Sequence, residues 1–151
     1  MDGYKPILLA DDNPRDAELA LSAMEEDHLA DKVAICRDGT EVLDYLYRRG
    51  PFATRSKGNP ILIILDLKMP KMDGLEVLQI IKGDQHLNRI PVVMLTSSRE
   101  ELDVARCYAS GANAYVVKPV DFPAYVKAVR ELGIFWGLIN EPPPPGASVP
   151  E

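Results

Sequence analysis

The sequence predicts an α/β domain in which helices cover both faces of a five-stranded parallel sheet, the arrangement known as doubly wound. Three observations lead to this prediction. Five short aliphatic runs recur along the chain, and each is followed by a segment with helical spacing of apolar residues. The runs are also almost continuously apolar, and strands have this character when helices cover both faces of their sheet.

The predicted strands and helices alternate strictly, five of each, which is the pattern of a doubly wound fold. The strands are expected at Pro6–Ala10, Lys32–Cys36, Ile61–Leu65, Pro91–Leu95 and Ala114–Val117. The first helix begins near Pro14, since proline favours the first turn, and its apolar face consists of Ala17, Ala20, Leu21 and Met24. The apolar faces of the other helices are Val42, Leu43 and Leu46, then Val77, Ile80 and Ile81, then Leu102, Ala105 and Ala109, and finally Tyr125, Val129, Leu132 and Trp136.

Two segments fall outside this alternation. Residues 50–60 contain two glycines and two prolines, a composition that predicts a long exposed loop before the third strand. Residues 140–151 (NEPPPPGASVPE) are rich in proline, which disfavours helix and sheet and predicts a flexible tail. A polyproline ligand at Pro142–Pro145 is the alternative interpretation of the tail. Residues 1–139 are expected to form one domain.

Composition limits the class of protein. The net charge of −6 argues against binding to nucleic acid, which requires a basic face. The longest aliphatic stretch is Ile61–Leu65, far shorter than the roughly 20 residues of a membrane span. The N-terminus lacks the profile of a signal peptide, and Cys36 and Cys107 lie in no metal-binding or disulfide pattern. We therefore expect a cytoplasmic protein with no nucleic-acid or membrane partner.

Polar and charged residues follow four of the five predicted strands directly. In chain order they are Asp11, Asp12, Asp66, Thr96 and Lys118. The carboxyl ends of parallel strands meet at one edge of the sheet, where proteins of this class bind ligands. If the strand order is 2-1-3-4-5, strands one and three are neighbours. The three aspartates then share one corner, and the threonine and the lysine flank it.

Three carboxylates in one corner repel one another, and a divalent cation together with a lysine would offset this repulsion. Mg²⁺ accepts a few carboxylate oxygens and leaves room for a phosphate oxygen. The sequence therefore predicts metal-assisted phosphoryl transfer to a carboxylate. Taken singly, Asp12 could be a helix N-cap, Thr96 a polar strand end and Lys118 a surface charge. Their joint placement at strand ends is what favours a common site.

Four short blocks carry a resemblance to a known family. They are Leu8–Asp12 (LLADD), Leu65–Gly74 (LDLKMPKMDG), Leu95–Ser97 (LTS) and Val117–Pro119 (VKP). In this order the blocks resemble the receiver domains of bacterial response regulators, over roughly residues 7–138. The resemblance implies the flavodoxin-like strand order 2-1-3-4-5 and transfer of a phosphoryl group from a histidine kinase to an aspartate.

The resemblance also implies roles for individual residues around a Mg²⁺ ion. Asp66 resembles the phosphoacceptor and a metal ligand. Asp12 resembles the direct metal ligand, and Asp11 the ligand that acts largely through water. Lys68, two residues after the acceptor, resembles the residue whose backbone carbonyl binds the metal.

Four further residues resemble the parts of the family that contact the phosphoryl group and respond to it. Lys118 resembles the lysine that contacts the phosphate, and its ammonium can pair with a carboxylate or a phosphate. Pro119 resembles the cis-proline that follows this lysine. Thr96 and Tyr115 resemble the switch pair, and the tyrosine, being amphipathic, can be turned outward or inward.

Two features resemble a narrower group, the small regulators paired with phytochrome-type histidine kinases. The stretch Tyr45–Pro60 is longer than in compact receivers, and Ile134–Ile139 (IFWGLI) is apolar for a helix end. This end either covers the bottom of the sheet or pairs with a second copy. Because receivers often dimerise through the fourth helix, fifth strand and fifth helix, we expect a C2 homodimer. The candidate contact residues are Tyr125, Phe135, Trp136 and Leu138.

The main functional prediction is a signalling switch that is phosphorylated on Asp66 by a histidine kinase, with a bacterial phytochrome as the candidate kinase. Its output would be a protein contact, phosphorelay or a change in self-association. One alternative is a receiver-like module that binds partners without phosphorylation. The other is a Mg²⁺-dependent phosphohydrolase with an aspartyl-phosphate intermediate. Such enzymes place an acid two residues after the nucleophile, where this chain has Lys68. We therefore expect that the protein is not an enzyme, apart from its own Mg²⁺-dependent phosphotransfer and autodephosphorylation.

Overall fold

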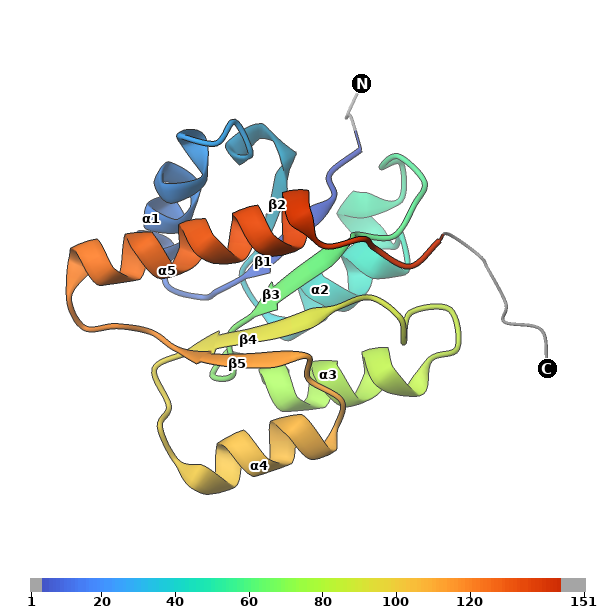
Figure 1. The fold of residues 1–151 in the computed structure, drawn as a ribbon. Coiled ribbons are helices and arrows are strands. Elements are labelled where there is room, and N and C mark those ends of the chain that lie inside the picture. The colour runs from blue at the N-terminus through green and yellow to red at the C-terminus, as the bar shows by residue number, and fades with distance from the viewer. Residues whose placement is uncertain (1–3, 145–151) are drawn as a thin grey trace.

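A computed structural model describes residues 4–144, and in it five parallel strands form one sheet with helices on both faces (Figure 1). The strand order is β2-β1-β3-β4-β5, so the predicted order is confirmed. Each strand lies within a residue or two of its predicted position. The strands are β1 (Ile7–Ala10), β2 (Val33–Cys36), β3 (Leu62–Leu65), β4 (Val92–Thr96) and β5 (Ala114–Val117).

Five α-helices follow the strands in turn, as the alternation predicts. They are α1 (Pro14–Glu25), α2 (Gly39–Leu46), α3 (Gly74–Gly83), α4 (Glu101–Ala109) and α5 (Phe122–Ile134). Short polar side chains begin four of them, because an N-cap oxygen can accept a backbone N–H that the helix leaves free. Asn13 caps α1, where Asp12 was the sequence-based candidate, and Asp73 caps α3 by accepting from the Glu76 N–H at 2.9 Å.

The core has two layers, one on each face of the sheet. Successive strand residues point to opposite faces, so Leu8 and Ile63 pack under α2, α3 and α4, while Ile7 and Leu62 pack under α1 and α5. All four are fully buried, which explains why the strands read as continuous apolar runs. Helix α4 is the exception among the covering helices, because only Cys107 of its nine residues is buried.

The loop before β3 is largely exposed, as the sequence predicts, but it contains a buried residue that the prediction did not include. Gly50–Phe52 form a 3-10 turn, and Arg55 is buried. The Arg55 guanidinium donates to the backbone oxygens of Tyr45 at 2.6 Å and Gly58 at 3.1 Å, and it lies 4.3 Å from the centre of the Tyr45 ring. An arginine can be buried in this way because its donors find carbonyl partners, four of them here, and its plane stacks on an aromatic face.

The C-terminal end of α5 continues as a π-helical turn, Phe135–Ile139. Within it Trp136 is half-buried against the core, whereas Phe135 and Leu138 are 47% and 57% exposed. The prediction that Tyr125 contacts a second copy is wrong, since this ring is buried and its hydroxyl donates to the Asp16 carbonyl at 3.1 Å. Its place on the apolar face of α5 directs it into the core.

Of the predicted tail at residues 140–151, the first five residues are described and form neither helix nor strand, and residues 145–151 lie outside the described part. Among the helices that the structure describes, none combines the length and the apolar character that crossing a membrane requires.

Gly74 allows α3 to start directly against the end of β3. A Cβ atom there would collide with the Asp66 carbonyl oxygen and lie 2.9 Å from the Leu67 Cα, whereas one on Gly83, at the other end of α3, would meet open space. We expect Gly74→Ala to lower the free energy of unfolding by about 2–4 kcal/mol through overpacking. Gly83→Ala should leave it within about 1 kcal/mol of wild type. Urea unfolding followed by circular dichroism measures both, and equal effects of the two substitutions would contradict this account.

Candidate functional site

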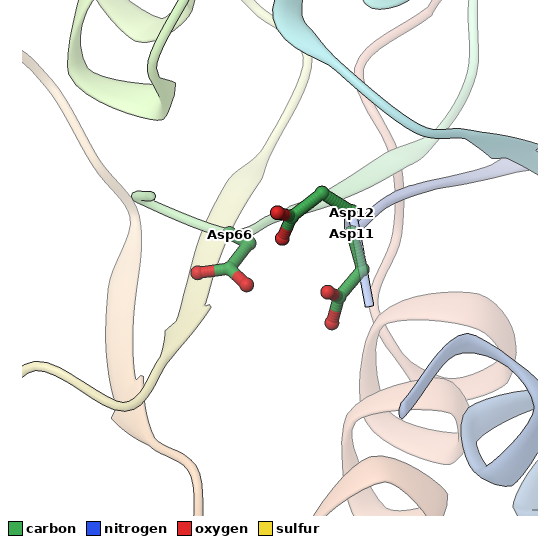
Figure 2. A group of neighbouring side chains, drawn as sticks. All are labelled: Asp11, Asp12 and Asp66. Carbon is green, nitrogen blue, oxygen red and sulfur yellow. The ribbon is translucent and has the colours of Figure 1, made fainter. Parts of the chain in front are cut away.

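Asp11, Asp12 and Asp66 come together at the carboxyl edge of the sheet. A carboxylate oxygen from each lies within 4.8 Å of the other two, and Figure 2 shows the three side chains grouped beside the ends of β1 and β3. Asp11 and Asp66 are 2% and 7% exposed, whereas Asp12 is exposed. The structure therefore contains the shared corner that the spacing of the aspartates predicts.

The pairing of β1 with β3 places these aspartates. Ala10 lies opposite Leu65 in the parallel register, so the residues that follow, Asp11 and Asp66, leave the sheet side by side. The Asp66 N–H donates to the Ala10 carbonyl at 3.0 Å, and the Asp11 N–H donates to the Cys36 carbonyl at 3.1 Å. Both backbones are thus held by the last bonds of the sheet, and only the side chains project beyond it.

Lys118 reaches the same corner from the end of β5. Its ammonium donates to Asp11 at 2.7 Å, to Asp66 at 3.0 Å and to Asp16 at 3.0 Å. Burial by itself lowers the pKa of Lys118, but the hydrogen bond with Asp11 and the charge of Asp66 outweigh burial and raise this pKa above its ordinary value. Lys118 therefore stays charged at neutral pH. Because it is also buried, the alternative interpretation of it as a surface charge does not hold.

The environment of Asp11 disfavours its ionised form. Burial raises the pKa of the Asp11 carboxyl to about 6, even though hydrogen bonds from Lys118 and from the Asn13 backbone act in the opposite direction. Neighbouring Asp66 adds to the rise through its like charge. The corner thus carries more negative charge than Lys118 alone stabilises.

The predicted cis bond before Pro119 is wrong, because every peptide bond among residues 4–144 is trans. Trans is the favoured isomer of an X-Pro bond by about 0.5–1 kcal/mol. With this isomer the Lys118 N–H still donates to the Thr96 carbonyl at 2.7 Å and its ammonium still reaches the aspartates.

The predicted switch residues lie on the neighbouring strands β4 and β5, two register positions apart, because Thr96 lies opposite Val117 and Tyr115 lies opposite Met94. Thr96 is buried, and its hydroxyl oxygen accepts the Ser98 N–H at 3.4 Å. The half-buried Tyr115 donates its hydroxyl to the Ser98 carbonyl at 3.0 Å. The Ser98 hydroxyl in turn donates to Asp103 of α4 at 2.6 Å. The segment after β4 is thus tied both to β5 and to α4. No role for Ser98 or Asp103 was predicted from the sequence.

The backbone of Lys68 lies close to the Asp66 carboxylate. Its N–H donates to Asp66 at 3.4 Å, while its exposed ammonium lies 4.0 Å from Asp103. The backbone of Lys68 therefore runs beside the carboxylate, as the family pattern requires, and the binding of metal by its carbonyl stays a prediction.

The donor set of this corner fits a hard divalent cation. All three candidate side chains offer carboxylate oxygens. Among the residues that the structure describes, no histidine or cysteine joins this group. Oxygen-only sites with few carboxylates suit Mg²⁺, Mn²⁺ or Ca²⁺ better than softer metals. The single ammonium of Lys118, shared with Asp16, leaves a net negative charge that a cation would balance.

A model of the response regulator receiver domain matches residues 7–130 of the chain, a range that contains every residue of this corner. The chain belongs to this family. Its members are signalling proteins that accept a phosphoryl group, and the sequence-based family prediction is confirmed.

The relatives of this receiver include phytochrome-associated regulators. It is 36% identical over 132 residues to the response regulator Rcp1 of Synechocystis, covering 87% of this chain and 88% of Rcp1. The structure of the phosphorylated cyanobacterial phytochrome response regulator RcpA is 37% identical with a TM-score of 0.86, covering 94% of this chain and all of that one. The structure of the bacteriophytochrome response regulator AtBRR is 57% identical with a TM-score of 0.71, and the match covers 92% of this chain and 99% of that one. Rcp1 has also been solved in a Mn²⁺-bound form.

Sequence reasoning missed Asp16, which the structure places on Lys118 together with Asp11 and Asp66. It lies in the first turn of α1, where an acidic residue has an ordinary explanation in the helix dipole. The only signal available was its position four residues after Asp12, on the turn of helix that directly follows the acidic pair.

The raised pKa of Asp11 predicts a pH dependence of stability in metal-free protein. The pKa of this carboxyl is about 6 in the folded protein, above its ordinary value of 3.8. Below about pH 4 the carboxyl is protonated in the folded protein and does not lower its stability. Above about pH 6 it is ionised, and the free energy of unfolding is lowered by the full cost of ionising a buried group. As the pH rises from 4 to 6, the unfolding free energy of wild type should fall by about 1–2 kcal/mol relative to that of Asp11→Asn. This range is smaller than the pKa shift alone would give, because water screens part of the interaction. Urea unfolding from pH 4 to 7 with a chelator present measures the difference. A constant difference across that range would contradict the raised pKa.

Proposed function

We propose that this receiver accepts a phosphoryl group on Asp66 from the phosphohistidine of a histidine kinase, with Mg²⁺ held by Asp11, Asp12 and Asp66. The observation that supports this proposal is the local environment of the Asp66 side chain. Its carboxylate is almost fully buried, lies 3.0 Å from a buried ammonium, and shares its corner with two more carboxylates. A carboxylate so placed can act as a nucleophile, and a charged lysine beside it can stabilise a phosphate.

In the proposed transfer, an Asp66 oxygen attacks the phosphorus of the donor. A P–O bond to Asp66 forms while the P–N bond to the kinase histidine breaks, and the imidazole leaves with that electron pair. Lys118 stabilises charge on the phosphoryl oxygens, because it already lies 3.0 Å from the acceptor oxygen. Mg²⁺, when bound, would neutralise further negative charge on these oxygens. Hydrolysis of the acyl phosphate returns Asp66 to its resting form.

The response to phosphorylation would pass through Thr96. Its hydroxyl can donate to a phosphoryl oxygen, and that would draw the segment after β4 toward Asp66. This segment is tied to Tyr115 and Asp103 through Ser98, so its movement would reach β5 and α4 together. The surface of α4 and β5 would then present a different shape to a protein partner.

For the partner we propose a phytochrome-type histidine kinase in the cytoplasm. Support comes from the phytochrome regulators among the relatives and from Cys36 and Cys107, which are buried as free thiols, as expected in a reducing compartment. We propose Mg²⁺ as the native metal, although Rcp1 was solved with Mn²⁺, because Mg²⁺ accompanies phosphoryl transfer in most sites built from carboxylates.

The phosphohydrolase alternative lacks its general acid. The residue two positions after Asp66 is Lys68, whose ammonium is exposed and points to Asp103, and a charged lysine on the surface cannot protonate a leaving group efficiently at neutral pH. A module that works without phosphorylation would have no need of the acidic corner with its buried ammonium. Phosphorylation of Asp66 therefore remains the better account of the site.

The first test is the intact mass of the protein after incubation with acetyl phosphate. With Mg²⁺ we expect one added phosphate on wild type and none on Asp66→Asn, because the amide cannot act as the nucleophile. Asp73→Asn is the matched control: it removes a carboxylate at the start of α3 yet keeps an N-cap residue, so it should be phosphorylated like wild type.

The same experiment separates the alternatives. A chelator should abolish the adduct, and p-nitrophenyl phosphate should not be turned over. If no adduct forms at short times with Mg²⁺ present, the protein is a binding module instead; sustained turnover of the ester would favour the hydrolase.

We also propose the C2 homodimer, with Phe135 and Leu138 as contact residues and α4, β5 and α5 as the interface. Both side chains are about half exposed and apolar, and large exposed apolar groups on one helix end favour association. On α4, Leu102 and Tyr108 are also exposed, at 57% and 50%, and would extend the apolar face.

In sedimentation velocity, the double substitution Phe135→Ser/Leu138→Ser should raise the dimer dissociation constant by about tenfold or more, since each side chain contributes about 1 kcal/mol or more when buried. Ile80→Ser is the control, because Ile80 is exposed on α3, outside the proposed interface. A wild type that sediments as a monomer at 100 µM would contradict the dimer, and an equal effect of the control would contradict this choice of residues.

A further inference from the structure

The ammonium of Lys118 is shared among three carboxylates, one of which lies outside the candidate metal site. Its nitrogen lies 2.7 Å from Asp11, 3.0 Å from Asp66 and 3.0 Å from Asp16. A lysine ammonium has three donor hydrogens, so these three contacts use all of them. The group of side chains able to hold a metal consists of Asp11, Asp12 and Asp66. Asp16 therefore touches the lysine of the site without joining the cluster of metal ligands.

Two hydrogen bonds fix the backbone of Asp16 opposite Lys118. Its N–H donates to the Asn13 side-chain oxygen at 3.2 Å within the N-cap of α1. Its carbonyl accepts the hydroxyl of the buried Tyr125 at 3.1 Å, which ties α1 to α5. The Asp16 side chain itself is 27% exposed, compared with 9% for that of Asp66. It is thus directed at the lysine from the solvent side of the pocket.

We infer that Asp16 is a positioning residue that takes a share of the Lys118 ammonium, and thereby sets both the metal affinity of the acidic corner and the rate of phosphoryl transfer to Asp66. The part that concerns transfer rests on the proposed function. The part that concerns metal binding depends only on the geometry of the four charged groups.

The effect on metal binding follows from competition for oxygens. Lys118 and a cation both require oxygens of Asp11 and Asp66, so a third carboxylate that draws the ammonium outward leaves these oxygens freer for the cation. Asp16 also adds a negative charge close to the site, which attracts a cation directly. Its removal should therefore weaken Mg²⁺ binding on both counts.

The effect on transfer has the opposite sign. An ammonium bound to Asp16 is less available to the oxygens of the incoming phosphoryl group, and the Asp16 carboxylate repels that anionic group. Replacing Asp16 by an uncharged residue of the same shape should turn Lys118 fully toward Asp66. Transfer at saturating Mg²⁺ should then become faster, although more Mg²⁺ is needed to reach saturation. A simple loss of packing would not produce opposite changes of this kind.

The test compares Asp16→Asn with Glu18→Gln, which removes the same charge from an exposed position on the same helix. Titration calorimetry of the unphosphorylated proteins gives the Mg²⁺ dissociation constant. We expect Asp16→Asn to raise it about three- to tenfold and Glu18→Gln less than twofold. Intact-mass time courses with acetyl phosphate at saturating Mg²⁺ give the transfer rate. We expect a two- to fivefold increase, on the order of 1 kcal/mol or less in the barrier, for Asp16→Asn alone.

Asp16→Glu, which returns a carboxylate, should move both values back toward wild type. Thermal unfolding by circular dichroism verifies that the variants are folded, and Asp16→Ser replaces Asp16→Asn if the latter is not. If Asp16→Asn binds Mg²⁺ like Glu18→Gln, or if its transfer rate falls, the inference is wrong. If wild type takes up no phosphate, the proposed function fails, and the Mg²⁺ titration still decides the role of Asp16.

Discussion

The contact of one buried ammonium with the carboxylates at the ends of β1 and β3 is the interaction on which the rest of the site depends. Burying a carboxylate costs several kcal/mol unless an opposite charge or hydrogen bonds compensate, and Lys118 supplies that compensation for Asp11 and Asp66 together. The fold places Lys118 there, because β5 lies two strands from β3 and ends at the same edge of the sheet. The chain at this end is held to β4 by the hydrogen bond from the Lys118 N–H to the Thr96 carbonyl. Sheet order and charge balance are thus parts of one arrangement.

Close packing of backbone against backbone holds Asp66 in place. Gly74 lets α3 begin against the Asp66 carbonyl, and Gly39 lets α2 begin against the Met72 backbone in a similar way. Neither position leaves room for a side chain, so the loop after β3 is confined between two helix starts. If Asp66 is the nucleophile, as proposed, this confinement would favour transfer, because its carboxylate would need little reorientation when a partner arrives.

Much of the fold could be predicted from the sequence because its strands are buried on both faces and therefore unbroken in their apolar character, as Leu62–Leu65 illustrate. The convergence of Asp11, Asp12 and Asp66 followed from strand order alone. Contacts that depend on side-chain reach could not be read in this way. Nothing in the spacing of residues indicates that Asp16 turns toward Lys118 or that Arg55 folds back over Tyr45. Similarly, the trans bond before Pro119 departs from the family pattern, and Tyr125 was assigned to a surface although its face of α5 is buried.

Helix α4 is held to the body of the protein by very little apolar surface, since only Cys107 is buried, and its N-terminal turn is fastened through the Ser98–Asp103 hydrogen bond. A net hydrogen bond to a charged group contributes about 1.5–3 kcal/mol, which is of the same order as the interactions that one phosphoryl group can form or break. The proposed movement of α4 would therefore require only a small change in free energy. Such weak anchoring also predicts that, among the five α-helices, α4 is the one whose amide hydrogens exchange with solvent soonest.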